Sequence, residues 1–375
     1  MTLRQGRVPY ENYRRDRPVA KGENMKTFCS LKTYLFLGLA LLFICGCDSI
    51  QKTILTDVPT AEDSAPLRVT VLYPSDCLGD DSYCDGIQSG AKRAEAELGI
   101  QLTEVLGMDS DVSLLEAQLR EAAQSSDMVL TAGYQTGEPL ARVAPEFPEV
   151  NFAIVDVVLE QPNVAAINYK ANEGSFLVGA IAALKSDSGK IGYIGGADVP
   201  LLHGFEAGYV AGVQAIRPEA ALLIDYISLN AEGFGQPEKA EELALTQYAN
   251  GVDVIYAVAG GAGLGIIEAA KQEKQYVIWV DSNGNHLIPG FVLTSMVKQI
   301  GDSVFQVLHE ATEGNVTMGV RYLGVADGGV DYSVDEHNQP VLSDEILTTV
   351  EALKAQIISG EIVVPDSVSL PRSTE

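Results

Sequence analysis

The sequence predicts an α/β protein of two lobes, each built on a mostly parallel sheet with helices on both faces. From Leu67 onward, short runs rich in apolar and β-branched residues alternate with segments of helical periodicity. This alternation is typical of parallel strands that are buried on both faces. About nine such strand–helix units are many for one open sheet, so two sheets are expected.

The expected elements follow one another regularly along the chain. In the first half, strands are expected at 67–73, 101–106, 128–132 and 151–155, and helices at 85–98, 113–124 and 137–145. The second half repeats the scheme, with strands at 190–194, 222–227, 253–258 and 276–280, and helices at 173–185, 201–216, 237–249 and 263–273. The expected strands are rich in apolar and β-branched residues, whereas apolar residues in the expected helices recur with a period of about 3.6 residues.

The N-terminal segment resembles a targeting sequence rather than a folded element. Residues 34–44 form an apolar run, which is too short to span a bilayer because a spanning helix needs about 20 residues. Lys26 and Lys32 precede the run and small residues follow it, which is the order of a secretory signal peptide. Met25 is a credible start, since the residues before it are polar and rich in arginine.

The apolar run ends in Ile44-Cys45-Gly46-Cys47, which resembles a bacterial lipoprotein box. That resemblance makes Cys47 the lipidated first residue of the mature chain, anchored in the cell membrane and facing the periplasm or the exterior. In a Gram-negative cell, Asp48 would favour retention at the inner membrane. The alternative is an ordinary signal peptide with an incidental cysteine.

Two segments therefore precede the lobes. Residues 1–46 are expected to be an N-terminal extension and a lipoprotein signal peptide. Residues 47–66 have no sustained period and are expected to be a tether.

The charge of the chain argues against nucleic acid as a partner. The sequence has 25 Lys and Arg against 51 Asp and Glu, a formal net charge of −26. Residues 1–46 hold eight basic and three acidic side chains, so the 329 residues from Cys47 onward carry −31. A protein this acidic repels a phosphate backbone.

The cysteines that remain after maturation form one pair. Cys29 and Cys45 leave with the signal peptide, so Cys77 and Cys84 remain beside the lipidated residue. An even pair in an oxidising compartment indicates a disulfide. The alternative is two free thiols, because a short loop often cannot meet the geometry of the bond.

Polar or glycine-rich loops follow several of the expected strands. Ligands of parallel α/β sheets bind at the carboxyl ends of the strands, where such loops converge. Two facing lobes therefore put the site in the cleft between them. The loops are 74–84, 133–138, 195–203, 232–237, 259–265 and 281–286.

At this point the chain resembles the basic membrane protein family of bacterial substrate-binding lipoproteins, from about Leu67 to about Val330. The best understood members are purine-nucleoside receptors of ABC transporters. The motifs are DDSYCDGIQSGAKRAEAELG at 80–99, NEGSFLVGAIAALKS at 172–186, GKIGYIGGADVPLLHGFEAGYVAGV at 189–213, VDVIYAVAGGAGLGIIEAAK at 252–271, WVDSNGNHLIPGFVLTSMVK at 279–298 and LGVADGGV at 323–330.

The resemblance implies the type I periplasmic-binding-protein fold, with two Rossmann-like lobes joined by several chain crossings. The first lobe is then expected at 67–168, completed by about 292–318. The second is expected at 169–291, completed by about 319–365. The implied function is the capture of nucleosides, purine nucleosides above all, for an ABC transporter permease.

The resemblance also implies which residues contact the ligand. In the family a purine base lies between two aromatic rings, and the matching positions here are Tyr83, where Phe is usual, and Phe234. The Asn that usually follows the first ring is replaced by Cys84. Stacking on such rings contributes roughly 1–3 kcal/mol. The alternative for both rings is ordinary core packing.

The remaining contacts are polar or involve close backbone approach. Glu138 matches the family acid that binds the base edge, and Asp80 matches the acid of the first motif. Asp281 and Lys298 are expected at the ribose, beside Gly260 and Gly261. The alternatives are an acid stabilised at a helix N-terminus for Glu138, and an interlobe salt bridge for Asp281 and Lys298.

No motif for catalysis, a metal or a cofactor is present. The sequence has no C-x-x-C, H-E-x-x-H, G-x-S-x-G or Walker A motif, and its four histidines are scattered. The sequence therefore predicts a binding protein without a cofactor or a metal. The alternatives are another small ligand, a ligand-sensing regulator and, remotely, a nucleoside hydrolase.

Overall fold

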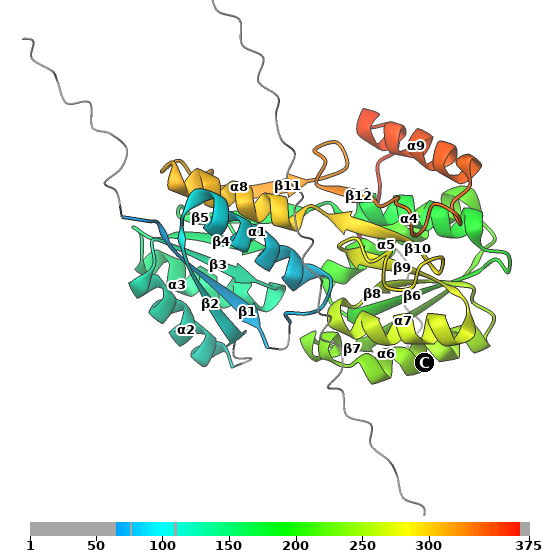
Figure 1. Ribbon diagram of the computed structural model, residues 1–375, viewed down its shortest axis with the longest axis horizontal. Helices are drawn as coiled ribbons and strands as arrows, with labels where there is room; N and C mark the ends of the chain where they lie inside the picture. The colour runs from blue at the N-terminus through cyan, green and yellow to red at the C-terminus, as the bar shows by residue number, and fades with distance from the viewer. Residues whose placement is uncertain (1–64, 76, 109–110, 368–375) are drawn as a thin grey trace, which may run out of the picture. The chain divides into compact units, whose positions relative to one another are not determined.

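The computed structural model describes residues 65–75, 77–108 and 111–367 (Figure 1). The signal peptide, the lipidated Cys47 and most of the tether that the sequence predicts lie outside these residues. The described residues belong to one compact unit, which contains the two sheets described below.

The first sheet is parallel throughout and has the strand order β11-β5-β4-β3-β1-β2. Helices α1 and α8 cover one face of this sheet and α2 and α3 cover the other (Figure 1). The strands are β1 (Arg68–Pro74), β2 (Gln101–Met108), β3 (Met128–Ala132), β4 (Asn151–Val155), β5 (Val164–Tyr169) and β11 (Gly319–Leu323), and the helices are α1 (Tyr83–Leu98), α2 (Val112–Ser125), α3 (Gly137–Val143) and α8 (Ile300–Thr312).

The second sheet has the order β12-β10-β9-β8-β6-β7, in which β12 alone runs antiparallel to its neighbour. Helices α4 and α5 cover one face, with α9 packed on α4, and α6 and α7 cover the other. The strands are β6 (Lys190–Ala197), β7 (Ala221–Ser228), β8 (Val254–Val258), β9 (Tyr276–Asp281), β10 (Val292–Lys298) and β12 (Val330–Tyr332), and the helices are α4 (Ala171–Lys185), α5 (Pro200–Ile216), α6 (Pro237–Ala249), α7 (Gly263–Glu273) and α9 (Asp344–Ser359).

This architecture confirms the predicted fold class, a two-lobed α/β protein of the periplasmic-binding type. Every expected strand and helix is present, with bounds that differ by a few residues. The sequence pattern did not predict β5, β10, β11, β12, α8 and α9. Short 3₁₀ helices η1 (Tyr134–Thr136), η2 (Ala144–Glu146), η3 (Ala231–Gly235) and η4 (Gly260–Ala262) follow β3, α3, β7 and β8.

The C-terminal third is divided between the lobes differently from the expectation. Residues 292–318 were expected to complete the first lobe, but β10 lies in the second sheet and only α8 packs on the first. Residues 319–365 were expected to complete the second lobe, but β11 lies in the first sheet. The reason is that an apolar strand carries no information about which of two sheets it joins.

The chain crosses between the lobes after β5, β10 and β11, and hydrogen bonds join these three crossings. Lys170 N–H donates to Leu323 O at 3.0 Å, and Gln299 N–H donates to Gly329 O at 2.9 Å. The Tyr169 hydroxyl donates to Gln299 O at 3.4 Å. Three adjacent, hydrogen-bonded crossings therefore connect the two lobes.

Helices α4 and α5 approach each other closely because glycines face carbonyl groups across the contact. A Cβ atom on Gly179 would lie 2.3 Å from Tyr209 O, and one on Gly212 would lie 2.0 Å from Phe176 O. No such position admits a side chain without movement of the backbone. This pair of helices therefore depends on glycine.

Replacing Gly212 with alanine is therefore expected to lower the free energy of unfolding by about 1–3 kcal/mol, through overpacking. Gly204→Ala is the matched control on the same helix, because its Cβ would meet only Asp366 O at 3.5 Å. That control is expected to be neutral or to stabilise, since alanine favours the helix by about 1 kcal/mol. Urea denaturation of both variants measures the difference, and equal stabilities would contradict the account of the α4–α5 contact.

Candidate ligand-binding site between the lobes

A cavity of about 450 Å³ lies at the carboxyl ends of strands from both sheets. The first lobe contributes the β1–α1 loop and the loop after β3, and the second contributes η3, η4, the N-terminal part of α5 and the ends of β9 and β10. This volume is in the range of pockets that enclose a small organic molecule. Four aromatic side chains, Tyr83, Tyr134, Phe205 and Phe234, line it together with several polar groups.

The structure brings together seven of the eight residues that the sequence predicts at the ligand. All seven line this one cavity. They are Asp80, Tyr83, Phe234, Gly260, Gly261, Asp281 and Lys298.

Glu138 is the exception, because it is not among the residues that line the cavity. It lies in the first turn of α3 with its side chain 78% exposed, and its carboxylate pairs with Arg142 Nη1 at 2.5 Å. The expectation that Glu138 reaches a ligand base is therefore not met, and its place matches the alternative of an acid at a helix N-terminus. The same loop contributes Tyr134 and Gln135 to the cavity instead.

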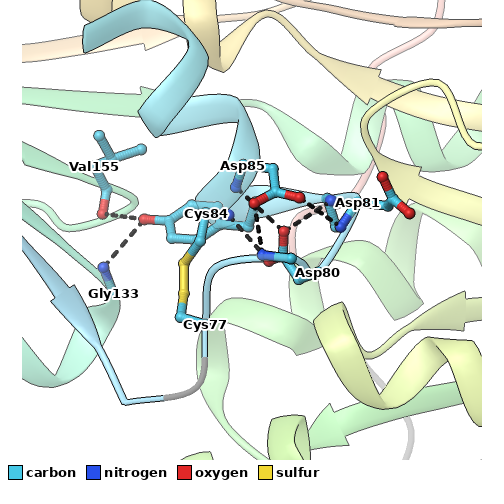
Figure 2. The surroundings of a disulfide bond; sticks show 10 residues. Cys77, Asp80, Asp81, Cys84, Asp85, Gly133 and Val155 are labelled. Atoms are coloured by element: carbon cyan, nitrogen blue, oxygen red, sulfur yellow. Dashed lines mark hydrogen bonds between the residues drawn. A yellow bond between two sulfur atoms is a disulfide. The ribbon is translucent and has the colours of Figure 1, made fainter. Parts of the chain in front are cut away.

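The ring of Tyr83 is fixed to the first lobe through its hydroxyl group. The hydroxyl donates to Val155 O and accepts from Gly133 N–H, both at 3.1 Å, so it joins the ends of β4 and β3 (Figure 2). Burial raises the pKa of Tyr83 well above its ordinary value, so the phenol stays neutral. Phenylalanine, which the resemblance would lead one to expect at this position, cannot make either hydrogen bond.

Asp80 organises the loop in which Tyr83 lies. Its carboxylate accepts from the backbone N–H groups of Ser82, Cys84 and Asp85 at 2.8, 3.0 and 3.2 Å (Figure 2). Burial raises the pKa of Asp80 to about 6, although these hydrogen bonds oppose the shift. Asp80 lines the cavity, but most of its hydrogen-bonding capacity serves the loop.

A disulfide closes the same loop. The structure pairs Cys77 with Cys84 at a Cα–Cα distance of 5.8 Å (Figure 2), within the range of about 4.4–6.8 Å that the bond requires. Cys77 lines the cavity, whereas Cys84 lies in the first turn of α1 next to Tyr83. The bond therefore restrains the wall that presents this ring.

The second lobe presents Phe234 over a surface without side chains. A Cβ atom on Gly196 would lie 2.5 Å from the Phe234 ring, and one on Gly260 would lie 3.5 Å from it. Gly233 approaches Gly196 O so closely that a Cβ there would overlap this oxygen. Glycines at these positions allow η3 to bring its aromatic residue to the cavity.

Lys298 is the positive centre of the site. Its ammonium lies 2.5 Å from Asp156 Oδ2 and 3.3 Å from Asp281 Oδ1, and its side chain is only 1% exposed. Burial alone would lower the pKa of Lys298, but the two carboxylates outweigh it and hold that pKa above its ordinary value. The rings of Tyr83, Tyr169 and Phe205 have centroids 5.1–5.4 Å from the ammonium, within reach of a cation–π attraction.

Asp156 is a cavity residue that the sequence reasoning missed. It directly follows β4 with φ 63°, just as Asp281 ends β9 with φ 66°. A signal was present, because the runs FAIVD at 152–156 and VIWVD at 277–281 share the pattern of an apolar strand that ends in aspartate. Lys298 joins these two equivalent positions, one from each lobe.

Direct hydrogen bonds between the lobes lie beside this cluster. The backbone oxygen of Asp81 accepts from Trp279 Nε1 at 3.0 Å and from the Ser282 hydroxyl. The Ser82 hydroxyl donates to Val280 O at 3.0 Å. The N-terminus of α1 is therefore joined to the end of β9.

The described residues contain one group suited to a metal ion by its donor types, namely Cys77, Asp80 and Cys84. The disulfide occupies both sulfur atoms, and the Asp80 carboxylate accepts three backbone N–H bonds. This group therefore does not fit a metal ion.

Comparison with protein families decides the classification. The family described as Bmp, ABC transporter substrate-binding protein PnrA-like, matches residues 67–368. The chain belongs to the Bmp family. The resemblance inferred from the motifs is thereby confirmed, and the members of this family are substrate-binding proteins of ABC transporters.

Individual Bmp relatives and a solved structure agree with this assignment. The chain is 28% identical to a CD4+ T-cell-stimulating antigen of Listeria innocua, over 91% of this chain and 99% of the relative. It is 30% identical to basic membrane protein A2 of Borrelia garinii subsp. bavariensis, over 76% and 85%. A crystal structure of ABC transporter system solute-binding proteins from Aeropyrum pernix K1 has a TM-score of 0.74 at 27% identity, over 80% and 94%.

Removing the buried ammonium is expected to destabilise the Bmp fold strongly. Lys298→Met leaves Asp156 and Asp281 buried without a cation, at a cost of about 3–5 kcal/mol. Burial raises the pKa of Asp281, and Lys298 opposes that shift, so loss of the lysine raises this pKa further. The folded variant then binds more protons than the folded wild-type protein, and the deficit is expected to grow as pH rises from 5 to 8.

Urea denaturation at both pH values measures this effect. Lys354→Met is the control, because Lys354 pairs with Asp331 at 2.6 Å with a more exposed side chain, and a small, nearly constant loss is expected there. A deficit of Lys298→Met that shrinks with rising pH would contradict the assignment of the two carboxylates.

The disulfide is expected to stabilise the β1–α1 loop. Non-reducing peptide mapping should recover Cys77 and Cys84 in one linked species. The Cys77→Ser, Cys84→Ser double variant should lose about 2–3 kcal/mol of unfolding free energy, as a short closed loop predicts. Free thiols at both positions in the unreduced, unfolded protein would refute the bond.

Proposed function

We propose that this substrate-binding protein is a lipid-anchored receptor that captures a nucleoside, with a purine base preferred, and delivers it to a membrane permease. One observation carries the proposal. Tyr83 from the first lobe and Phe234 from the second line the same cavity. A planar base between two rings from opposite lobes would bind best when the lobes close.

The base has polar as well as aromatic neighbours in this arrangement. Stacking on a ring contributes roughly 1–3 kcal/mol for any base and does not distinguish one base from another. The side chain of Gln135 lies in the same wall, and an amide both donates and accepts hydrogen bonds. We assign to Gln135 the reading of the base edge that the sequence had given to Glu138.

The sugar is assigned to the end of β9. Asp281 Oδ1 is buried beside Lys298 Nζ, which lies 3.3 Å away. A ribose hydroxyl would donate a further hydrogen bond to this carboxylate. Gly260 and Gly261 line the cavity nearby, where the absence of a side chain allows a sugar to approach the backbone.

Delivery needs a difference between the empty and the loaded receptor. The three crossings would serve as a hinge, while the contacts of Asp81 with Trp279 and Ser282 join the lobes at the cavity. A bound nucleoside would add contacts to both lobes and so favour the closed state. The permease would then recognise that state.

The membrane anchor is inferred from the amino-acid sequence alone. It rests on the apolar run and the cysteine pattern that ends at Cys47. Within the described ranges, no helix combines the length and the apolar character that crossing a bilayer requires. Mass spectrometry of the membrane-bound protein, with Cys47→Ser as the comparison, tests for the acyl chains.

Calorimetric titration of the detergent-solubilised protein with adenosine, guanosine, inosine, cytidine and uridine tests the ligand class. Tyr83→Ala and Phe234→Ala are each expected to weaken purine-nucleoside binding about 5- to 100-fold, the loss of one stacked ring. Tyr322→Ala is the control, because Tyr322 is 54% exposed and does not line the cavity.

Fluorescence gives a second readout of the same experiment. Trp279 is the single tryptophan of the chain, and it donates to Asp81 O across the lobes. Its emission is expected to change when a nucleoside closes the receptor. If no nucleoside at millimolar concentration produced heat or an emission change, the ligand assignment would be wrong.

A further inference from the structure

The cavity carries a strong excess of negative charge. Among the described residues that line it, four have carboxylates and one has an ammonium. The acids are Asp80, Glu232, Asp156 and Asp281, and the base is Lys298. Their formal sum is −3, and the whole chain adds a field of the same sign, since its net charge is −26.

The ammonium in the cavity is not available to an incoming anion. Lys298 Nζ already lies against Asp156 at 2.5 Å and Asp281 at 3.3 Å, so this group of three residues keeps a net charge of −1. Its side chain is 1% exposed. A phosphate would have to displace a carboxylate to reach it, at a large electrostatic cost in a partly desolvated cavity.

The other walls also favour positive charge. The rings of Tyr83, Tyr134, Phe205 and Phe234 line the cavity, and the negative face of an aromatic ring attracts a cation. Lys298 shows this preference within the protein itself, because it lies near the rings of Tyr83 and Phe205. A cationic heterocycle would therefore lie between π faces, and the carboxylates that line the same cavity would attract its charge.

We propose that this cavity selects its ligand by charge, so that it excludes phosphorylated nucleosides and binds a cationic nucleoside more tightly than a neutral one of the same size. The proposal rests on the nucleoside-binding function proposed above and names a ligand class within it. The chemical class is a purine nucleoside alkylated on a ring nitrogen, whose ring carries a positive charge at neutral pH.

Three adenosine derivatives of different charge test whether ligand charge determines affinity. 1-Methyladenosine is cationic at neutral pH, N6-methyladenosine is its neutral isomer, and adenosine monophosphate is the anion. Titration of the full-length protein in detergent at low salt is expected to give at least fivefold tighter binding of the cation than of its isomer. The monophosphate is expected to bind at least 100-fold more weakly than adenosine.

Salt and a charge variant distinguish electrostatics from shape. The advantage of the cation is expected to shrink when the ionic strength rises from 0.02 to 0.5 M, because screening weakens the attraction at the exposed carboxylate. Glu232→Gln is expected to reduce the ratio of cation to neutral affinity by roughly two- to threefold, a modest change because this side chain faces solvent. Glu238→Gln, an exposed acid in the first turn of α6 that does not line the cavity, is the matched control.

The possible results separate this inference from the proposed function. If adenosine binds but the monophosphate binds within threefold of it, or the cation binds no tighter than its isomer at any salt concentration, charge selection is wrong and nucleoside binding stands. If no nucleoside binds but 1-methylnicotinamide binds more tightly than nicotinamide, charge selection stands and the nucleoside function is wrong. If neither pair binds, both are wrong.

Discussion

The site depends on one buried ionic contact, in which Lys298 at the end of β10 meets Asp156 from the first lobe and Asp281 from the second. Burying three charges has a high desolvation cost, which the attraction between them and precise geometry must offset. Lys298 also lies where the chain crosses from β10 to α8. The contact therefore fixes the relative position of two strand ends, one from each lobe, that line the cavity.

The two lobes position their aromatic residues, Tyr83 and Phe234, in different ways. On the first lobe, hydrogen bonds from Tyr83, the Asp80 carboxylate and the Cys77–Cys84 bond restrain a short loop. On the second lobe, glycines remove side chains so that Phe234 can approach the sheet. A restrained loop therefore positions Tyr83, and glycines make room for Phe234, so that both rings line one cavity.

The order of strands and helices could be predicted because burial on both faces leaves apolar runs that periodicity detects. The positions of Tyr83, Phe234 and Asp281 followed from motifs of the family. The position of Glu138 could not be predicted, because one residue along a short helix turns a side chain from the cavity to solvent. Nor could the sequence predict which sheet β10 joins, because the apolar pattern of this strand fits either lobe.

The backbone oxygen of Asp81 accepts hydrogen bonds from Trp279 and Ser282. This role bears on which amino acids position 81 can tolerate. Every amino acid carries this acceptor, so no replacement at position 81 deletes it, and the side chain there is exposed. The constraint comes instead from the dihedral angle φ of 48°, which aspartate, asparagine and glycine adopt most readily. Variation at this position should therefore be confined by chain geometry and indifferent to charge.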